Sequence, residues 1–330
     1  MQVRKLRDIE VSAVGMGCMG FSHGYGAVPP EEESIRLIHK AFDLGCTFFD
    51  TAEAYGPFVN EELVGKAVKP FRDKIILTTK FVPVFQPGQE IPEGKLSKKG
   101  VTNALNDSLK RLQTDYIDIY YQHRVPIDSN VEEVAQWMGE FIKEGKIRAW
   151  GQSQSTVEQI RKAHAITPLT AIQSEYSMME RMFERDVIPT CKELNIGFVA
   201  FSPMASGFLS GKYDKNTQYK GDDVITRFAP ENVEKNQPLL DLLHEVANKK
   251  GITPAQISLA WMLKKYDFVV PIPGMRKDER VIENLGAADI ELTDAEFEKI
   301  EKELDKITIY GNRTDEDIHK LGTVKAIETK

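Results

Sequence analysis

Four side chains that can move or stabilise a proton follow successive apolar runs of the sequence. Asp50 ends the run at residues 46–50, and Tyr55 comes shortly after it. Lys80 ends the run at 75–80, and His123 closes the segment that continues from the run at 116–121. Polar residues at the ends of buried strands are costly unless they are paired, so each of the four needs an explanation.

Such a set suits proton delivery to a carbonyl oxygen while hydride arrives at the carbon. A free tyrosine has a pKa of about 10, which is too high for easy proton traffic at neutral pH. We expect the Lys80 ammonium to stabilise the Tyr55 phenolate and lower that pKa, with Asp50 holding Lys80 charged and in place. His123 would donate a hydrogen bond to the substrate oxygen and orient it.

Each of these residues has an ordinary structural explanation when it is taken alone. A strand-end Asp or Lys is more often half of a structural ion pair, and a lone Tyr after a strand usually packs. The other histidines serve as a control, because they fall in helical patterns, a Gly-rich loop or the C-terminal tail: His23, His39, His164, His244 and His319. The combination of four residues at strand ends therefore favours a catalytic site over coincidence.

The elements that position these residues alternate along the chain. Eight short apolar runs are typical of buried parallel strands, at residues 13–18, 46–50, 75–80, 116–121, 147–151, 171–173, 197–202 and 268–272. Helix starts are predicted between them by capping patterns at Asn130–Glu133, Ser155–Glu158, Thr253–Gln256 and Thr293–Glu296. A small hairpin is expected at residues 3–6 and 9–11. Eight strand–helix units favour a closed barrel or a doubly wound sheet.

A dinucleotide-binding pattern near the N-terminus is misleading. Gly15, Gly17 and Gly20 match G-x-G-x-x-G, which requires a helix to open at the third glycine. Residues 21–30 contain too many Gly and Pro residues for a helix. These glycines are better explained by a close approach of backbone and ligand at the end of the first strand.

Composition excludes several other classes of protein. The chain has 330 residues and a net charge of −7, without the clustered Lys and Arg that nucleic acid binding requires. The start lacks the apolar stretch of a signal peptide, and no run approaches a membrane span. The three cysteines are scattered, which predicts neither disulfides nor a metal site. We expect a cytoplasmic protein, and the sequence leaves open whether it is a monomer or a homo-oligomer.

The sequence resembles the aldo-keto reductases from Gly15 to about Ala288. Asp50-Thr-Ala-Glu-Ala-Tyr-Gly56, Lys80 and His123 match that family in order and spacing. The resemblance is closest to a branch of bacterial, fungal and plant reductases that includes perakine reductase-like and auxin-induced-type proteins. It implies a (β/α)₈ TIM barrel with an N-terminal β-hairpin and extra C-terminal helices, in a single domain of residues 1–330 with a tail at 310–330. It also implies Asp50, Tyr55, Lys80 and His123 as the catalytic tetrad.

The same resemblance implies a nicotinamide cofactor, with NADPH favoured over NADH. Ser153 and Gln173 would bind the nicotinamide carboxamide, and Phe201 would stack on the ring. The pyrophosphate would lie along Ser202, Pro203, Gly207, Leu209 and Gly211. The adenosine 2′-phosphate and the adenine would be bound by Gly274, Arg276, Lys277, Arg280, Glu283 and Asn284. Gln154 and Met275 depart from the family pattern, since relatives commonly have Asn or Glu and Thr or Ser there.

The substrate would be a small aldehyde or ketone above Tyr55. Aromatic lining suits carbonyl compounds with apolar bodies. Besides His123, the candidate lining residues are Met19, Phe21, Tyr25, Phe58, Phe81, Phe85 and Arg124.

Two other functions fit parts of the pattern. Potassium-channel β-subunits resemble this family, so a cofactor-binding, redox-sensing regulatory protein is an alternative to an enzyme. The intact tetrad favours the enzyme. A metal-dependent hydrolase on the same barrel would need a His, Asp and Glu cluster with ligand spacing, and the sequence offers none.

Overall fold

The computed structural model describes residues 1–23, 27–82, 96–126, 129–212, 214, 216 and 228–311. The predicted substrate residues Tyr25 and Phe85 lie outside these ranges, as does nearly all of the predicted tail at 310–330. Within the described ranges, no helix has the length and apolar character needed to cross a membrane.

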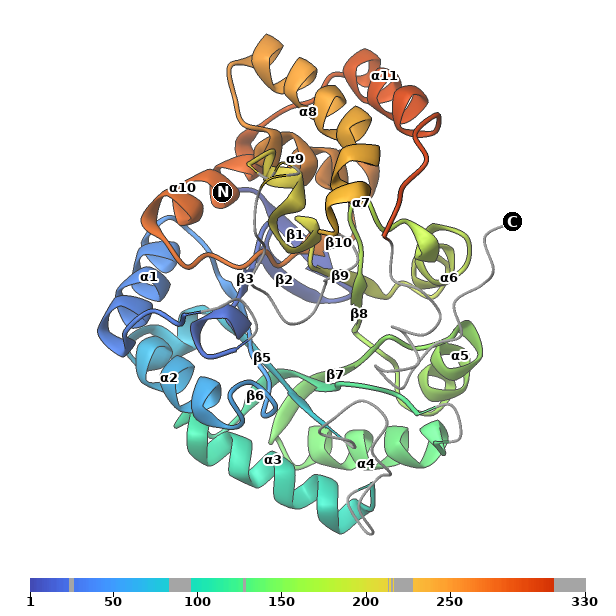
Figure 1. The fold of residues 1–330 in the computed structure, drawn as a ribbon. Helices are drawn as coiled ribbons and strands as arrows, with labels where there is room; N and C mark the ends of the chain where they lie inside the picture. Colours follow the sequence, from blue (N-terminus) through green and yellow to red (C-terminus); the bar gives the residue numbers. More distant parts are fainter. Residues whose placement is uncertain are drawn as a thin grey trace.

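A ring of parallel strands forms the centre of the molecule (Figure 1). Eight strands pair in the spatial order β10-β9-β8-β7-β6-β5-β4-β3. Their bounds are β3 (Met16–Gly17), β4 (Phe48–Asp50), β5 (Ile76–Phe81), β6 (Ile117–Gln122), β7 (Ile147–Ser153), β8 (Ala171–Glu175), β9 (Gly197–Phe201) and β10 (Val269–Pro271). All eight predicted runs therefore contain a strand, although the first is paired over only two residues.

The sheet closes between its first and last strands. The Gly15 N–H donates to the carbonyl oxygen of Pro271 at 2.9 Å, and the Gly17 N–H donates to that of Pro273 at 3.2 Å. A parallel bridge also joins Gly17 to Gly274. These contacts confirm the (β/α)₈ barrel and exclude the doubly wound sheet.

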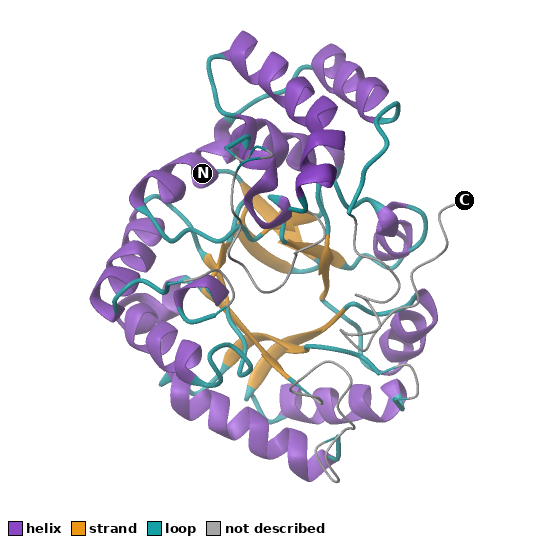
Figure 2. Ribbon diagram, viewed as in Figure 1, coloured by secondary structure: helices purple, strands orange, loops and turns teal. Residues whose placement is uncertain are grey.

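Helices follow the strands and cover the outside of the ring (Figure 2). They are α1 (Glu31–Asp43), α2 (Val59–Val68), α3 (Lys98–Leu112), α4 (Val131–Lys143), α5 (Val157–Ile166), α6 (Val187–Glu193), α9 (Pro254–Lys265) and α10 (Asp278–Gly286). Three more helices stand beyond the ring, namely α7 (Pro230–Lys235), α8 (Gln237–Lys250) and α11 (Asp294–Leu304). Lys299 of α11 binds Glu245 of α8 at 2.7 Å. Of these, α11 is the extra C-terminal helix that was expected, whereas α7 and α8 lie between β9 and β10.

The predicted N-terminal hairpin is present. It consists of β1 (Val3–Leu6) and β2 (Ile9–Ser12), which pair antiparallel. Leu6 and Val11 are fully or almost fully buried and pack against interior residues of the barrel such as Phe48. The hairpin therefore covers the barrel interior on the side where the chain enters it.

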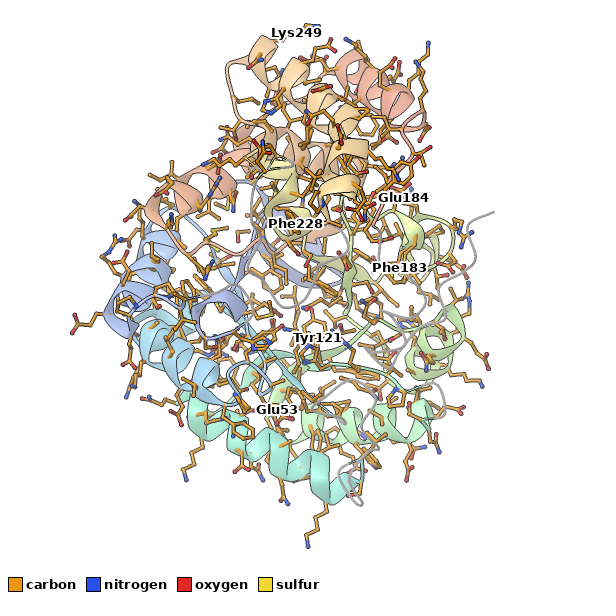
Figure 3. All side chains as sticks on the ribbon, viewed as in Figure 1. Glu53, Tyr121, Phe183, Glu184, Phe228 and Lys249 are labelled. Atoms are coloured by element: carbon orange, nitrogen blue, oxygen red, sulfur yellow. The ribbon has the colours of Figure 1, made fainter. Side chains whose placement is uncertain are left out.

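Side chains on the strands alternate between two separate cores. Phe48 faces the barrel interior, where Tyr121 also lies near the centre of the ring (Figure 3). Phe49 and Tyr120, their chain neighbours, face the layer between strands and helices. Because the strand period is two, every second residue near the end of a strand must point into the barrel mouth.

The glycine pattern at residues 15–20 supports barrel closure. A Cβ on Gly17 would lie 2.6 Å from the carbonyl oxygen of Ile272, and one on Gly20 would lie 2.9 Å from the side chain of Arg276. The first long helix, α1, begins only at Glu31. These glycines thus allow close contacts with the segment after β10, whereas the predicted approach to a ligand stays a prediction. Among the described residues, the only helix between β3 and α1 is the short η1 (Met19–Phe21).

One helix start differs from its predicted position. The N-cap of α5 is Thr156, which forms a reciprocal capping box with Gln159. The pattern read from Ser155 and Glu158 was therefore shifted by one residue. Ser155 with Glu158 and Thr156 with Gln159 both place a small hydroxyl residue three positions before a Glu or Gln. The sequence alone therefore does not distinguish the two possible capping boxes.

The inner core leads to a prediction about stability. In Gly151→Ala, the added methyl group would lie 2.5 Å from the ring of Tyr121 and would also meet the backbone of Ala171. We expect the free energy of unfolding to fall by about 1–3 kcal/mol, because a packed core resists extra volume. Urea denaturation measures this, with Gly274→Ala as the control because no atom lies within 4 Å of its added methyl. Equal stability of the two variants would refute the packing argument.

Candidate active site

The segment after β4 holds Tyr55 over the end of the barrel. The Thr51 N–H donates to the carbonyl oxygen of Thr78, and the Glu53 N–H donates to that of Lys80 at 3.2 Å. The chain then turns back, since the Phe58 N–H donates to the carbonyl oxygen of Glu53 at 2.8 Å. Residues 51–58, which we call the tyrosine loop, are thus bound to strand β5 at their start.

Asp50 and Lys80 form a buried ion pair at the ends of adjacent strands. The Lys80 Nζ atom lies 2.5 Å from Asp50 Oδ2, with side-chain exposures of 0% and 3%. Lys80 also donates to the carbonyl oxygen of Thr51 at 2.7 Å. The other carboxylate oxygen of Asp50 accepts from Thr78 Oγ1 at 2.8 Å and from Gln173 Nε2 at 2.9 Å. Buried charges persist when they are paired and their remaining hydrogen-bonding capacity is used.

The tyrosine and the histidine lie beside this pair. The Tyr55 hydroxyl is 3.3 Å from Lys80 Nζ. The ring of His123 meets that of Tyr55 edge-on, with centroids 5.7 Å apart and an interplanar angle of 85°. The structure therefore brings together all four residues of the predicted tetrad.

The electrostatic expectation for Tyr55 is only half correct. Burial raises the pKa of Tyr55, and the Lys80 cation lowers it, but the net pKa is above the ordinary value. The predicted net lowering is therefore wrong, because burial of the hydroxyl raises the pKa by more than the Lys80 cation lowers it. As a consequence, Tyr55 keeps its proton at neutral pH.

The other two titratable partners have opposite shifts. Burial lowers the pKa of Lys80, but Asp50 and Tyr55 more than offset it, so the net pKa is raised and the ammonium persists. Burial, together with the cations Arg124 and Lys80, holds the pKa of His123 well below its ordinary value. His123 is therefore a neutral imidazole, and its Nδ1 has no hydrogen-bond partner among the described residues.

The predicted nicotinamide residues lie on the same rim. Ser153, the last residue of β7, is the register partner of Gln173, the middle residue of β8. Arg124 donates to Ser153 Oγ at 3.3 Å and to the carbonyl oxygen of His123 at 2.8 Å. Its guanidinium carbon is 6.0 Å from the ring centroid of Phe201. Arg124 thus connects the tetrad to the predicted cofactor residues.

The link from Gln173 to Asp50 was missed by the sequence analysis. The two residues are 123 positions apart in the chain. The only available signal was that both residues end predicted strands, although β8 continues beyond Gln173 to Glu175.

The predicted pyrophosphate segment forms a compact turn after β9. It includes η4 (Ala205–Ser210), with left-handed backbone at Ser202 (φ 48°) and Gly207 (φ 98°). The N–H groups of Gly207 and Leu209 donate to the carbonyl oxygen of Met204, and that of Gly211 donates to Phe208. In this structure these three N–H groups therefore serve the turn itself. Leu209 is fully buried, and Pro203 is also buried.

The predicted adenosine residues gather at the start of α10. Lys277 is the N-cap of this helix. Arg280 pairs with Glu283, and Asn284 donates to the carbonyl oxygen of Gly274 at 3.4 Å. Arg276 donates to the carbonyl oxygen of Ala27 at 3.2 Å. Cations at the first turn of a helix suit a phosphate group.

Three predicted substrate residues need correction. Phe21 and Phe81 are buried in the outer core, at 3% and 2% exposure, and the Phe81 ring lies 5.4 Å from that of Tyr120. Phe81 points outward because its neighbour Lys80 points inward. Phe58 packs outside the barrel under the guanidinium of Arg111, at 4.6 Å.

A different residue lies at the mouth of the site. The exposed ring of His23 is parallel to that of Tyr55, with centroids 6.5 Å apart. His23 follows Met19, a predicted substrate residue in η1 (Met19–Phe21), and this proximity was the signal that could have identified it. No group of three or more potential metal ligands occurs in the part of the chain that the structure describes.

The fold and the rim define a (β/α)₈ barrel protein with an Asp–Lys–Tyr–His site at the carboxyl ends of its strands. The sequence model of the Aldo/keto reductase family matches residues 13–305. The chain therefore belongs to the aldo/keto reductase family, whose members are oxidoreductases.

Known relatives cover nearly the whole chain. "Probable aldo-keto reductase 1" from Glycine max is 39% identical over 302 residues, which is 89% of this chain and 86% of that protein. The glycerol dehydrogenase AKR11B4 from Gluconobacter oxydans superposes with a TM-score of 0.82 at 27% identity, covering 93% and 95% of the two chains. An aldo-keto reductase from Klebsiella pneumoniae, solved in complex with NADPH, superposes with a TM-score of 0.71 at 27% identity, covering 92% and 95%.

The neutral His123 gives a prediction for stability against pH. Its pKa is lower in the folded protein than in the unfolded chain, so the unfolded chain binds a proton first as the pH falls. Below about pH 6.5, we expect this group to reduce the free energy of unfolding by up to about 1.4 kcal/mol per pH unit. Denaturant titrations between neutral and mildly acidic pH measure the slope. His123→Gln should show a slope shallower by that amount, and identical slopes would contradict the buried neutral state.

Proposed function

We propose that this protein is an NADPH-dependent carbonyl reductase in which Tyr55 protonates the oxygen of a small aldehyde or ketone. The observation that carries the proposal is the 3.3 Å distance between the Tyr55 hydroxyl and Lys80 Nζ. At this distance, the phenol that would donate the proton lies next to a cation at the mouth of the barrel. Membership of the aldo/keto reductase family supports the same reaction class.

Tyr55 holds the proton until the substrate needs it. Its raised pKa keeps the phenol neutral in its part-buried position. As the substrate oxygen gains charge, it takes the proton, and the phenolate that remains lies beside the Lys80 ammonium. Asp50 keeps that ammonium charged and in place through the 2.5 Å ion pair.

His123 is suited to orient the substrate. As a neutral imidazole, it can donate one hydrogen bond to the carbonyl oxygen without competing for the proton of Tyr55. Its edge-on contact with the Tyr55 ring places both groups at one point of the rim. Arg124 adds a fixed positive charge next to His123.

The rim also fits a nicotinamide cofactor. When bound, NADPH supplies the hydride that reaches the carbonyl carbon. Ser153 and Gln173 offer a hydroxyl and an amide side by side for its carboxamide. Gln173 donates one N–H to Asp50, which leaves its amide oxygen and a second N–H to offer. Phe201 contributes an aromatic face, and Arg276, Lys277 and Arg280 surround the start of α10.

The first test concerns the proton donor. Tyr55→Phe should lower kcat for aldehyde reduction by at least about 100-fold, because general acid catalysis typically contributes that much. The dissociation constant for NADPH should change by less than about twofold, since the hydroxyl serves the chemical step. The assay follows NADPH consumption against a panel of aldehydes and ketones. Tyr120→Phe, in the outer core, is the matched control and should retain wild-type kcat.

The outcomes of this test separate the enzyme from its rival. Full activity of Tyr55→Phe would end the proposed mechanism. A wild-type protein that binds NADPH but oxidises it with none of the carbonyl compounds would be a redox-sensing regulator instead.

The second test concerns cofactor preference. Arg280→Ala should weaken NADPH binding by about 10-fold or more, because a charge-assisted hydrogen bond contributes roughly 1.5–3 kcal/mol. NADH, which has no 2′-phosphate, should bind almost as before. Fluorescence titration with both cofactors measures the two constants, and equal losses would refute the phosphate assignment. Lys302→Ala on α11 is a charge-matched control outside the predicted site.

A further inference from the structure

A second charged cluster lies outside the barrel, behind the tyrosine loop. Glu61, in the first turn of α2, is fully buried. Its carboxylate accepts from Thr79 Oγ1 at 2.6 Å and from Arg111 Nε at 2.6 Å. None of these residues takes part in the proposed proton transfer. A buried carboxylate of this kind depends on its partners, because an unpaired charge in the interior is strongly unfavourable.

Arg111 reaches from this carboxylate to the tyrosine loop. Its guanidinium carbon lies 4.6 Å from the ring centroid of Phe58, within the range of a cation–π contact. One terminal nitrogen is 3.9 Å from Glu53 Oε2 and donates to Ser108 Oγ at 3.2 Å. The side chain is only 15% exposed. Figure 3 shows Glu53 beside the inner side of α3, the helix that carries Arg111.

Glu53 and Phe58 are two of the points at which the tyrosine loop is held, in addition to Thr51. Glu53 accepts from the Val82 N–H at 2.8 Å, and its carbonyl oxygen receives the Phe58 N–H at 2.8 Å. Phe58 adopts a left-handed backbone with φ 71°, which a bulky residue takes only when its surroundings impose it. Tyr55 lies between these two points. Arg111 therefore contacts the residues on both sides of the tyrosine.

Strand β5 connects the two charged clusters. Thr79 points outward to Glu61, and the next residue, Lys80, points inward to Asp50 and Tyr55. Successive residues of one strand share a backbone and cannot move independently. The contact of Thr79 with Glu61 therefore helps to fix the backbone from which Lys80 extends.

We infer that Arg111 is a positioning residue that holds the Tyr55 hydroxyl within reach of Lys80 Nζ. It does so by fixing the tyrosine loop through Phe58 and Glu53, and strand β5 through Glu61. This inference rests on the proposed function, since it concerns how the proton donor is held. A displacement of about 1 Å at a reacting group can reduce a rate by about 100-fold.

The main variant is Arg111→Met, which keeps much of the side-chain length and removes the cation. We expect kcat to fall by about 10- to 100-fold, with KM and the NADPH dissociation constant within about threefold of wild type. Arg111→Lys restores the charge without the planar fork, so its kcat should lie between those of Arg111→Met and wild type. Kinetics are measured well below the melting temperature of each variant.

A matched control is available at another place in the barrel. Arg72 pairs with the fully buried Asp118 at 2.8 Å and lies over the ring of Tyr116 at 4.1 Å. It thus repeats the carboxylate and aromatic contacts of Arg111 without touching the tyrosine loop. Arg72→Met should lower the melting temperature while leaving kcat within about twofold of wild type. If the two Met variants lose kcat equally, Arg111 has a general structural role and the inference is overturned.

A double-mutant cycle tests whether Arg111 acts through Tyr55. In the Tyr55→Phe background, Arg111→Met should cause no further loss of kcat, because the group that it positions is already gone. Independent, multiplicative losses would overturn the inference. If Arg111→Met does not fold, Glu61→Gln and Phe58→Leu each weaken one contact of Arg111, and each should lower kcat by about 3- to 10-fold. Wild-type kcat in both variants would count against the positioning role.

The two proposals fail in different ways. Retained activity in Tyr55→Phe removes the proposed function itself. Loss of activity in Tyr55→Phe together with wild-type kcat in Arg111→Met removes only the positioning role.

Discussion

The buried pair of Lys80 and Asp50 is the constraint on which the rest of the site depends. An ammonium without solvent is stable only beside its carboxylate, and that carboxylate needs further donors for its second oxygen. Thr78 and Gln173 supply them, and the carbonyl oxygen of Thr51 accepts a second hydrogen bond from the ammonium. Strands β4, β5 and β8 must therefore meet at one rim, and only a closed barrel places the first two opposite the third.

Around this pair, burial and charge give each titratable group a different protonation state. Burial keeps the proton on Tyr55, although the nearby cation favours its release. Burial and two cations keep His123 neutral. The carboxylate keeps Lys80 charged. The site therefore contains a protonated phenol, a neutral imidazole and a fixed cation, which is the set of groups that the proposed proton delivery to a carbonyl oxygen would use.

Strand β5 shows how the barrel supports this arrangement from outside. Its inward residues build the site, and its outward residues bind the helix layer, where Glu61 and Arg111 share a buried ion pair. The tyrosine loop lies between the two, bound to β5 by backbone hydrogen bonds and to α3 by side chains. The same alternation moves Phe81 into the outer core, so the aromatic residue next to Lys80 is unavailable to a substrate.

The sequence by itself determined the order of strands and helices and the four residues of the site, which lie at strand ends or, for Tyr55, shortly after one. Apolar runs and polar ends are local properties, and parallel strands bring their carboxyl ends to one rim whatever the details. Only the tertiary structure decided which partner each group meets. The hydrogen bond from Gln173 to Asp50, the contact of Arg111 with Glu61 and the outward turn of Phe58 join residues from different elements. The net pKa of Tyr55 likewise depends on how much protein encloses its hydroxyl, and enclosure exists only once the barrel has closed.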